Sequence, residues 1–136
     1  MDYIVYTDGA SKGNPGPSSI GVVIQNNRGE TLKEYSHYLG DKLTNNEAEY
    51  GAIVFAFKKI KLLIGKEKTK LSEIEFRTDS KLLVEQLNGR YKLSHPNTQR
   101  LFIEVWNLKT EFKKINFFYI PREQNTRADE LANQII

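Results

Sequence analysis

The chain has 136 residues, of which 39% are hydrophobic and 27% charged, with no cysteine and a formal net charge of +3 at pH 7. This is the composition of a globular domain long enough to bury a core, and the lack of cysteine excludes disulfides, thiolate zinc sites and thiol nucleophiles. No apolar run approaches the roughly 18 residues of a membrane span, and the N-terminal MDYIVYTDGA has no features of a signal peptide. We therefore expect one domain over residues 1–136 that is cytoplasmic and has no membrane partner.

The first third of the chain predicts an antiparallel meander of three strands. Tyr3–Thr7 is apolar with β-branched and aromatic residues, which favours a buried strand. Gly9–Ser19 contains three glycines and two prolines and is typical of a loop. Ile20–Gln25 and Thr31–Leu39 are further strands, and Asn26–Gly29 between them is typical of a hairpin turn.

The rest of the chain alternates helices with strands. From Glu49 to Ile64 the apolar residues recur at helical spacing, and Thr44, Asn45 and Asn46 before them are candidate N-caps. The later predicted elements are a strand over Glu73–Thr78, a helix from Ser80 to about Gly89, a helix over Thr98–Phe112, a strand over Ile115–Ile120, a loop over Pro121–Arg127 and a helix over Ala128–Ile136 with Ile135 facing inward. The order βββαβααβα requires parallel crossovers, so we expect an α/β fold with a mixed sheet and helices on its faces.

Lysines gather at the end of the first predicted helix and in the predicted loop after it. They are Lys58, Lys59, Lys61, Lys66, Lys68 and Lys70. Such clusters are more often solvated faces than binding patches. A pI of about 9.0 is compatible with a polyanionic partner but does not decide between the two interpretations.

Four acidic residues fall where the predicted elements would bring them together. Asp8 and Asp79 each follow a strand, and ligands of open α/β sheets gather at the carboxyl ends of parallel strands. Glu49 is in phase with the apolar stripe of its helix, whereas Glu47 is turned away by about 200°. Asp129 opens the last helix, and its distance from the others depends on a strand neighbour that the sequence leaves open. The alternative for each aspartate is a helix cap or a dipole partner.

Clustered carboxylates imply a cation. Like charges at short range raise one another's pKa unless a cation lies between them. Oxygen ligands of this kind select Mg²⁺ or Mn²⁺. Two such ions, about 3.5–4 Å apart, can activate a water and stabilise the leaving oxygen of a phosphodiester. The four acids therefore predict a metal-dependent hydrolase of phosphodiesters.

Four segments together resemble type 1 ribonuclease H over nearly the whole chain: TDGASKGNPGP around Asp8, TNNEAEYGA around Glu49, RTDSKLLV around Asp79 and QNTRADELAN around Asp129. The resemblance implies a ribonuclease H-like fold, with a five-stranded mixed sheet in the order 3-2-1-4-5, the first three strands antiparallel and helices on both faces. It also implies endonucleolytic hydrolysis of RNA paired to DNA, leaving 5′-phosphate and 3′-hydroxyl ends.

By the same resemblance, Asp8, Glu49, Asp79 and Asp129 are the catalytic residues and the ligands of two Mg²⁺ ions, for which Mn²⁺ can substitute. Glu49 would also lie near the 2′-hydroxyl, the group that distinguishes RNA from DNA locally. The partner is an RNA–DNA hybrid, and we expect a monomer with no obligate protein partner. The residues expected to bind the hybrid are Gly9, Ser11, Lys12, Asn14, Thr44, Asn45, Asn46, Ser80 and Arg122. For Asn45, Asn46 and Ser80 the alternative is simple helix capping.

The chain departs from many relatives in three places. The loop before Asp129 has no histidine; Arg122 is its nearest basic residue, which cannot act as a base near neutral pH and would contact phosphate or eject product. Gly89–Asn97 carries no basic, tryptophan-bearing helix, and a first strand at Tyr3 leaves no N-terminal hybrid-binding module. Both absences predict weaker and more salt-sensitive hybrid binding. The alternative function is a weakly active or inactive module that binds hybrid or duplex RNA.

Overall fold

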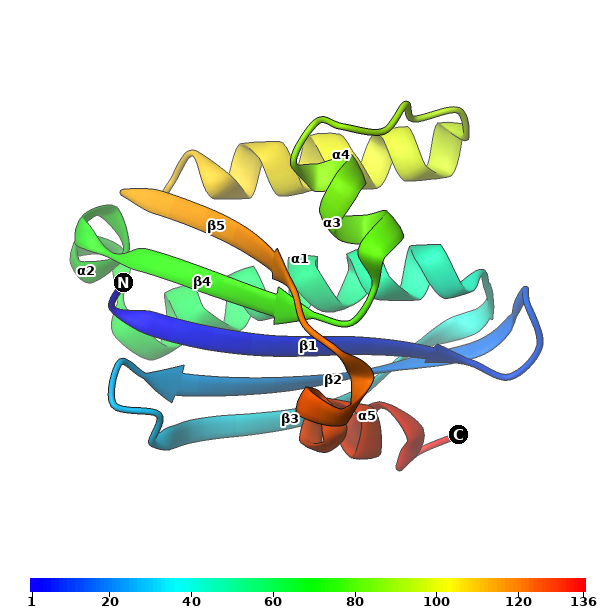
Figure 1. The fold of residues 1–136 in the computed structure, drawn as a ribbon, viewed down its shortest axis with the longest axis horizontal. Coiled ribbons are helices and arrows are strands. Elements are labelled where there is room, and N and C mark those ends of the chain that lie inside the picture. Colours follow the sequence, from blue (N-terminus) through cyan, green and yellow to red (C-terminus); the bar gives the residue numbers. More distant parts are fainter.

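Five strands form one twisted sheet in a computed structural model that describes all residues 1–136 (Figure 1). The strands are β1 (Tyr3–Ser11), β2 (Gly16–Asn26), β3 (Thr31–Leu43), β4 (Glu73–Thr78) and β5 (Lys114–Tyr119). Their order is β3-β2-β1-β4-β5; β1, β2 and β3 pair antiparallel, and β4 pairs parallel with both β1 and β5. The predicted fold class and strand order are therefore confirmed.

Helices cover both faces of this sheet. They are α1 (Asn45–Ile64), α2 (Lys66–Leu71), α3 (Lys81–Leu87), α4 (Pro96–Lys109) and α5 (Thr126–Asn133), with a 3-10 turn at Arg122–Gln124. In Figure 1, α1 lies behind the sheet with α4 packed against it, whereas α5 lies in front, against β1 and β2. None of these helices combines the length and the apolar character of a membrane span.

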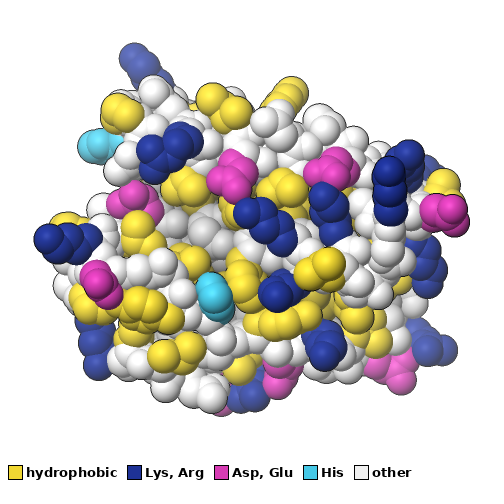
Figure 2. All heavy atoms as spheres, turned by 180° about the vertical axis from the view of Figure 1, so that it is seen from behind, with side chains coloured by type: hydrophobic (Ala, Val, Ile, Leu, Met, Phe, Trp, Pro, Cys, Tyr) yellow, Lys and Arg dark blue, Asp and Glu magenta, His cyan; other side chains and the backbone are white.

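The core lies between the sheet and α1. Alternate strand residues such as Val5, Val22 and Phe76 are fully buried or nearly so on the α1 face. Phe57 of α1 packs its ring against the rings of Phe76 and Phe112, with centroids 4.8 and 5.4 Å apart. Burying each such side chain stabilises the fold by about 1.5–3 kcal/mol, so α1 is fixed firmly to the sheet. Seen from behind, the face over α1 mixes apolar side chains with lysines and arginines (Figure 2).

The predicted loop Gly9–Ser19 is wrong over most of its length. β1 continues to Ser11 and pairs with β2, which already begins at Gly16, and only residues 12–15 connect the two strands. The Lys12 amide donates to the Pro17 carbonyl at 2.8 Å and closes the hairpin. Glycine and proline are weak strand formers, but the antiparallel ladder overrides this local preference.

Further boundaries differ from prediction: β3 runs to Leu43 and not to Leu39, and α4 covers Pro96–Lys109 and not Thr98–Phe112. The lysine-rich segment expected to be a loop forms α2, in which the Thr69 amide and hydroxyl both donate to the Gly65 carbonyl. The last helix runs over Thr126–Asn133 and not to Ile136, so Ile135 lies beyond it and is 50% exposed, not inward. Short helices are set by such local bonds and by tertiary contact, which a periodic pattern does not capture.

Candidate active site

Three carboxylates meet just beyond the point where the parallel pairing of β1 and β4 ends, so Asp8 lies within β1 and not after it as predicted. Asp8 lies in β1 and is buried, and Asp79 directly follows β4, the parallel neighbour of β1. Glu49 comes from the second turn of α1, which packs against β1. Each of these acids offers an oxygen, and the three oxygens lie within 4.8 Å of one another. The sheet topology thus brings together acids that are far apart in sequence.

Gly9 lets α1 approach β1 closely enough to place Glu49. A Cβ atom on Gly9 would lie 2.5 Å from the Ala48 carbonyl carbon, so no other residue fits there without a shift of the backbone. The Gly9 amide donates to Glu49 Oε1 at 2.5 Å and orients that carboxylate. The carboxylate of Glu47 instead accepts from the Thr44 amide at 3.0 Å and closes a capping box. The two glutamates therefore point differently, as their helical phase indicates.

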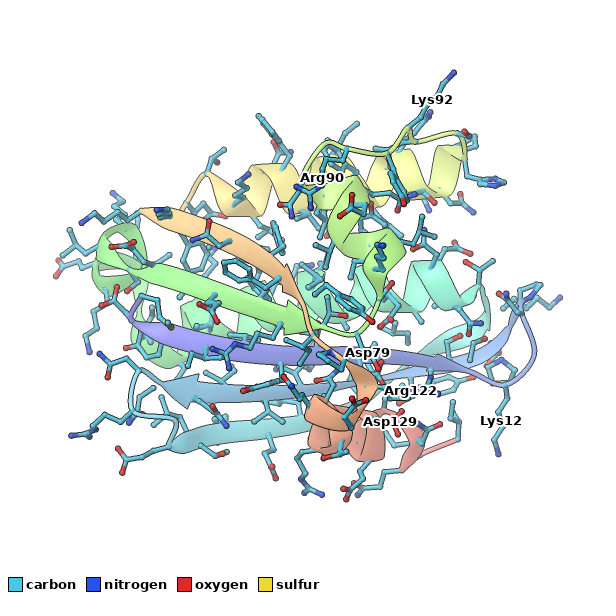
Figure 3. The ribbon with its side chains drawn as sticks, in the orientation of Figure 1. Lys12, Asp79, Arg90, Lys92, Arg122 and Asp129 are labelled. Carbon is cyan, nitrogen blue, oxygen red and sulfur yellow. The ribbon has the colours of Figure 1, made fainter.

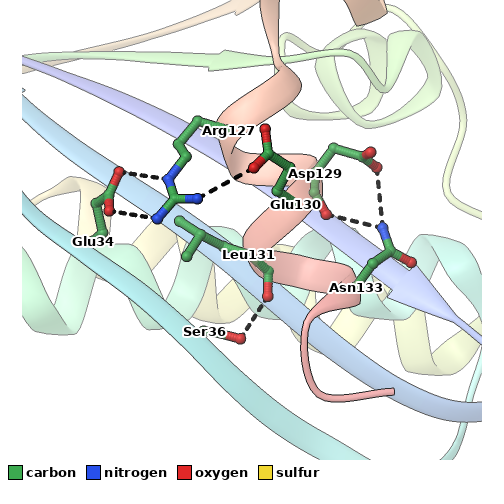
Figure 4. A network of polar contacts seen from close by, with 7 residues as sticks. All are labelled: Glu34, Ser36, Arg127, Asp129, Glu130, Leu131 and Asn133. Atoms are coloured by element: carbon green, nitrogen blue, oxygen red, sulfur yellow. Dashed lines mark hydrogen bonds and ion pairs between the residues drawn. The ribbon is translucent and has the colours of Figure 1, made fainter.

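Asp129 lies beside Asp8, although it is outside the three-acid cluster. Its side chain lies close enough to Asp8 to help raise the pKa of that acid. The amide of Asp129 donates to the carbonyl of Asn125, and the buried Asn125 side chain donates to the carbonyl of Thr7 at 2.9 Å, immediately before Asp8. Asn133 Nδ2 donates to Asp129 Oδ1 at 3.2 Å (Figure 4). These contacts hold Asp129 near Asp8, a position that the sequence leaves open.

The helix that carries Asp129 rests directly on the sheet. A Cβ atom on Gly21 would lie 2.1 Å from the Ala128 carbonyl oxygen, so this glycine allows α5 to contact β2 through its backbone. Arg127 donates two hydrogen bonds to Glu34 of β3, at 2.8 and 2.9 Å (Figure 4). The Ser36 hydroxyl donates to the Leu131 carbonyl and binds the far end of the helix to the same strand. Backbone contact and a few polar bonds therefore hold α5.

The cluster is electrostatically strained without a cation. Burial, and then the charges of Glu49 and Asp79, raise the pKa of Asp8 to about 9. Burial and the charge of Asp79 raise the pKa of Glu49 to about 8, although the Gly9 amide and the Arg122 charge oppose this rise. Near neutral pH the two acids would hold protons, and a divalent cation would displace them. Oxygen-only donors at this spacing fit Mg²⁺ or Mn²⁺.

Arg122 is the basic residue nearest to the acids in the loop before Asp129. Many relatives carry a histidine in this loop, and this chain has none. The Nε atom of Arg122 lies 3.6 Å from Asp79 Oδ2, and its side chain is 86% exposed. Figure 3 shows Arg122 between Asp79 and Asp129. The guanidinium can therefore reach both the acids and a ligand that approaches from solvent.

A hollow of about 530 Å³ lies beside the start of α1 and gathers several of the predicted substrate-binding residues. Asn14, Thr44 and Asn46 line it, together with Lys92. The Thr44 hydroxyl accepts from the Glu47 amide, which leaves its own proton free to donate. The hollow thus joins polar side chains to Lys92 and also includes Glu47 and His95, and we call it the polar groove.

Other predicted substrate-binding residues lie elsewhere or have internal partners. Ser11 donates to the carbonyls of Gly13 and Leu43 and so holds the β1–β2 hairpin. Ser80 accepts from the Leu83 amide at 3.3 Å and caps α3. The Asn45 amide donates to the Asn14 side chain at 2.9 Å. Lys12 is exposed in the hairpin connection and points away from the labelled acids (Figure 3).

Two residues at the site were not predicted. Asn125, which is 1% exposed, connects α5 to β1 as described above. Gln86 accepts from Tyr50 at 3.1 Å and from Asn46 at 3.4 Å at one wall of the polar groove. Gln86 could have been found because it follows the inward-facing Leu83 by three positions, which is helical spacing. Asn125 could have been found because asparagine just before a helix is a typical capping residue.

Comparison with known proteins places these features in a wider group. Residues 6–135 match the family model described as "Reverse transcriptase-like". The "Bifunctional protein Rv2228c" of Mycobacterium tuberculosis is 36% identical over 133 residues, which is 98% of this chain and 35% of that protein. "Ribonuclease HI" of Halobacterium salinarum is 35% identical over 131 residues, which is 96% of this chain and 62% of that protein. The chain thus spans about a third of the length of the mycobacterial relatives that it matches.

One solved structure has the same fold as this chain over nearly the whole length of both. The crystal structure of LC11-RNase H1 in complex with an RNA/DNA hybrid superposes with a TM-score of 0.91 at 42% sequence identity. The match covers 97% of this chain and 94% of that chain. The similarity therefore includes the sheet and the helices that carry the acids.

Proposed function

We propose that this chain, which belongs to the type 1 ribonuclease H family, is an endonuclease that hydrolyses the RNA strand of RNA–DNA hybrids. The observation that carries the proposal is the approach of three carboxylate oxygens to within 4.8 Å, with Asp129 close beside Asp8. The crystal structure of LC11-RNase H1 with a hybrid bound supports the same class of substrate.

We propose that Asp8, Glu49, Asp79 and Asp129 hold two divalent ions, Mg²⁺ or in its place Mn²⁺. Such ions, when bound, supply an activated water and stabilise the leaving 3′-oxygen, which gives 5′-phosphate and 3′-hydroxyl products. The chain contributes the orientation of its carboxylates. The Gly9 amide fixes one oxygen of Glu49 and Asn133 fixes one oxygen of Asp129, so both side chains are preorganised before any ligand arrives.

Arg122 has a separate proposed role. Arginine stays charged at any physiological pH and cannot take a proton from water. Its guanidinium balances part of the negative charge of the acids, with 3.6 Å between Nε and Asp79 Oδ2. A bound cation would take over that balance and free the exposed guanidinium to contact a substrate phosphate or to help product leave.

Selection of the hybrid is proposed to come from the polar groove and from Glu49. Asn14 and Asn46 offer carboxamides, and Thr44 offers a hydroxyl proton, to the sugar edges and phosphates of a nucleic acid. Lys92 at the same groove adds a charge that attracts the backbone. Glu49 is proposed to contact the RNA strand near its 2′-hydroxyl, the group that DNA lacks.

The test is cleavage of a hybrid in which the RNA and DNA strands carry different labels, with Mg²⁺ or Mn²⁺. We expect cuts only in the RNA strand, no cuts in a DNA duplex of the same sequence, and a rate at least roughly a thousandfold lower for Asp8→Asn. If the protein binds the hybrid but leaves it intact with either ion, it is an inactive binding module and the proposal is wrong.

A further inference from the structure

A second hollow, of about 760 Å³, lies at the end of the molecule that carries α2, away from Asp79 and Asp129 (Figure 3). It is enclosed by the last turns of α1, by α2 and by the connection from α4 to β5, beside the N-terminal ends of β4 and β5 (Figure 1). We call it the lysine hollow; its rim and floor include Lys58, Lys61, Lys66, Lys70, Leu62 and Phe112. It shares no residue with the acid cluster or the polar groove.

The walls of the lysine hollow are fixed by internal bonds. Gly65 has a φ of +85°, which turns the chain sharply from α1 into α2. Thr69 bonds to the Gly65 carbonyl through both its amide, at 3.0 Å, and its hydroxyl, at 2.7 Å. The Lys113 amide donates to the Ser72 carbonyl at 3.1 Å and ties the α4–β5 connection to the end of α2. The hollow is therefore preformed, and a ligand would bind without ordering its walls.

Charge at the rim is strongly unbalanced. Lys58 pairs with Glu104 at 3.3 Å and Lys61 pairs with Glu111 at 2.6 Å, so carboxylates already sit against two of the rim lysines. Lys66 and Lys70 are exposed and form no ion pair. Carboxylates can therefore reach the rim lysines, and the ammonium groups of Lys66 and Lys70 are available to pair with further ones.

The lysine hollow also exposes apolar surface beside those charges. Leu62 lies at the rim and is 78% exposed. Phe112 closes the hollow from the other side, and the aliphatic stems of the rim lysines extend this surface. Exposed apolar area of this kind, surrounded by charge, is typical of a protein-binding site.

We propose that the lysine hollow docks a segment of another protein that carries several acidic side chains next to one or two bulky apolar ones. The acidic side chains would pair with Lys66 and Lys70, and the apolar ones would cover Leu62 and the aliphatic stems of the rim lysines. A nucleic-acid strand is disfavoured because Glu111 lies at the rim and repels phosphates, and because phosphates gain nothing from Leu62. Docking here would tether the nuclease and leave its acids and the polar groove open.

The test uses a fluorescein-labelled peptide in which three glutamates stand on each side of a Leu-Phe pair. Binding is measured by fluorescence anisotropy, and the site is mapped by the shifts of backbone amide resonances in the full chain. We expect the dissociation constant to rise at least about tenfold for the double variant Lys66→Glu, Lys70→Glu and for Leu62→Ser. The charge-matched control Lys33→Glu, on β3 outside the hollow, should bind as the unchanged protein does, and all variants should cut hybrid normally.

Several results would overturn the proposal. These are no binding, equal binding of a peptide whose Leu-Phe pair is replaced by two serines, or amide shifts confined to residues outside 58–72 and 109–113. Tighter binding of single-stranded DNA, or of vesicles containing phosphatidylglycerol, through Lys66 and Lys70 would instead assign the surface to a nucleic acid or a membrane. Failure of hybrid cleavage would leave peptide binding unaffected, so the two proposals are tested separately.

Discussion

α1 and α5 bring an acid to the same strand, β1, by different physical means. α1 has 20 residues and eight buried side chains, so Glu49 is positioned by the hydrophobic core. α5 has eight residues and only three buried ones, and backbone contact with Gly21 and a few polar bonds hold Asp129 in place. One acid is therefore tied to the stability of the whole domain, whereas the other depends on a small element that can move without unfolding the rest.

The sharpest test of the α1 side compares its two glutamates. Glu49→Gln should lower the single-turnover rate of hybrid cleavage by roughly a hundredfold or more, because the carboxylate faces Asp79 and a proposed cation. Glu47→Gln removes charge from the capping box and should cost only about 0.5–1 kcal/mol of stability, with cleavage nearly unchanged. Equal losses of rate would show that helical phase does not separate the two residues.

Gly9 and Gly21 each allow a helix to approach the sheet closely, and substituting them should affect stability and activity to different degrees. Gly9→Ala forces α1 away from β1 and should lower the free energy of unfolding by about 1–3 kcal/mol, together with activity. Gly21→Ala forces α5 away from β2 and should reduce cleavage by a larger factor than its effect on stability implies, because α5 can shift alone. Urea unfolding and cleavage rates measured on both variants check this. If Gly21→Ala proves as destabilising as Gly9→Ala, α5 is part of the main cooperative core.

The pH dependence of stability should belong to the α1 side. The folded state raises the pKa of Asp8 to about 9 and that of Glu49 to about 8, both above their values in the unfolded chain. Stability from these groups is therefore complete below about pH 4 and is lost as pH rises towards 8 or 9. Without divalent ions, we expect the melting temperature of the protein to fall between pH 5 and 8 as these two acids lose their protons. Added Mg²⁺ should make this fall smaller. Glu49→Gln should flatten the curve; an unaltered slope would contradict the assignment.

The smallest expected effect concerns the link between α5 and β1. Asn125→Ala removes the donor to the Thr7 carbonyl and should cost about 1–3 kcal/mol, because that carbonyl is buried. Cleavage should fall by about tenfold as Asp129 loses its position. The matched control is Asn133→Ala, whose side chain is exposed and bonds within α5, and it should destabilise less. An Asn125→Ala variant with full activity would remove Asn125 from the site.

The sequence predicted the parts of the site that depend on long, periodic elements. The mixed sheet follows from the crossovers, its strand order follows from the family resemblance, and the inward position of Glu49 follows from a stripe that continues through α1. The position of Asp129 could not be predicted, since it depends on a bond between Asn125 and Thr7, which are 118 residues apart. The Gly9–Ser19 segment was misread for a related reason: its strands are stabilised by pairing with each other and not by their own composition.

The central claim is that four acids form one metal site. They are Asp8 of β1, Glu49 of α1, Asp79 after β4 and Asp129 of α5. The most direct test is anomalous diffraction from a crystal of the protein soaked in Mn²⁺. We predict two peaks, both touching Asp8, with Glu49 and Asp79 around one or both and Asp129 at the second. Peaks elsewhere, or a single ion that leaves Asp129 uncoordinated on a displaced α5, would contradict the claim.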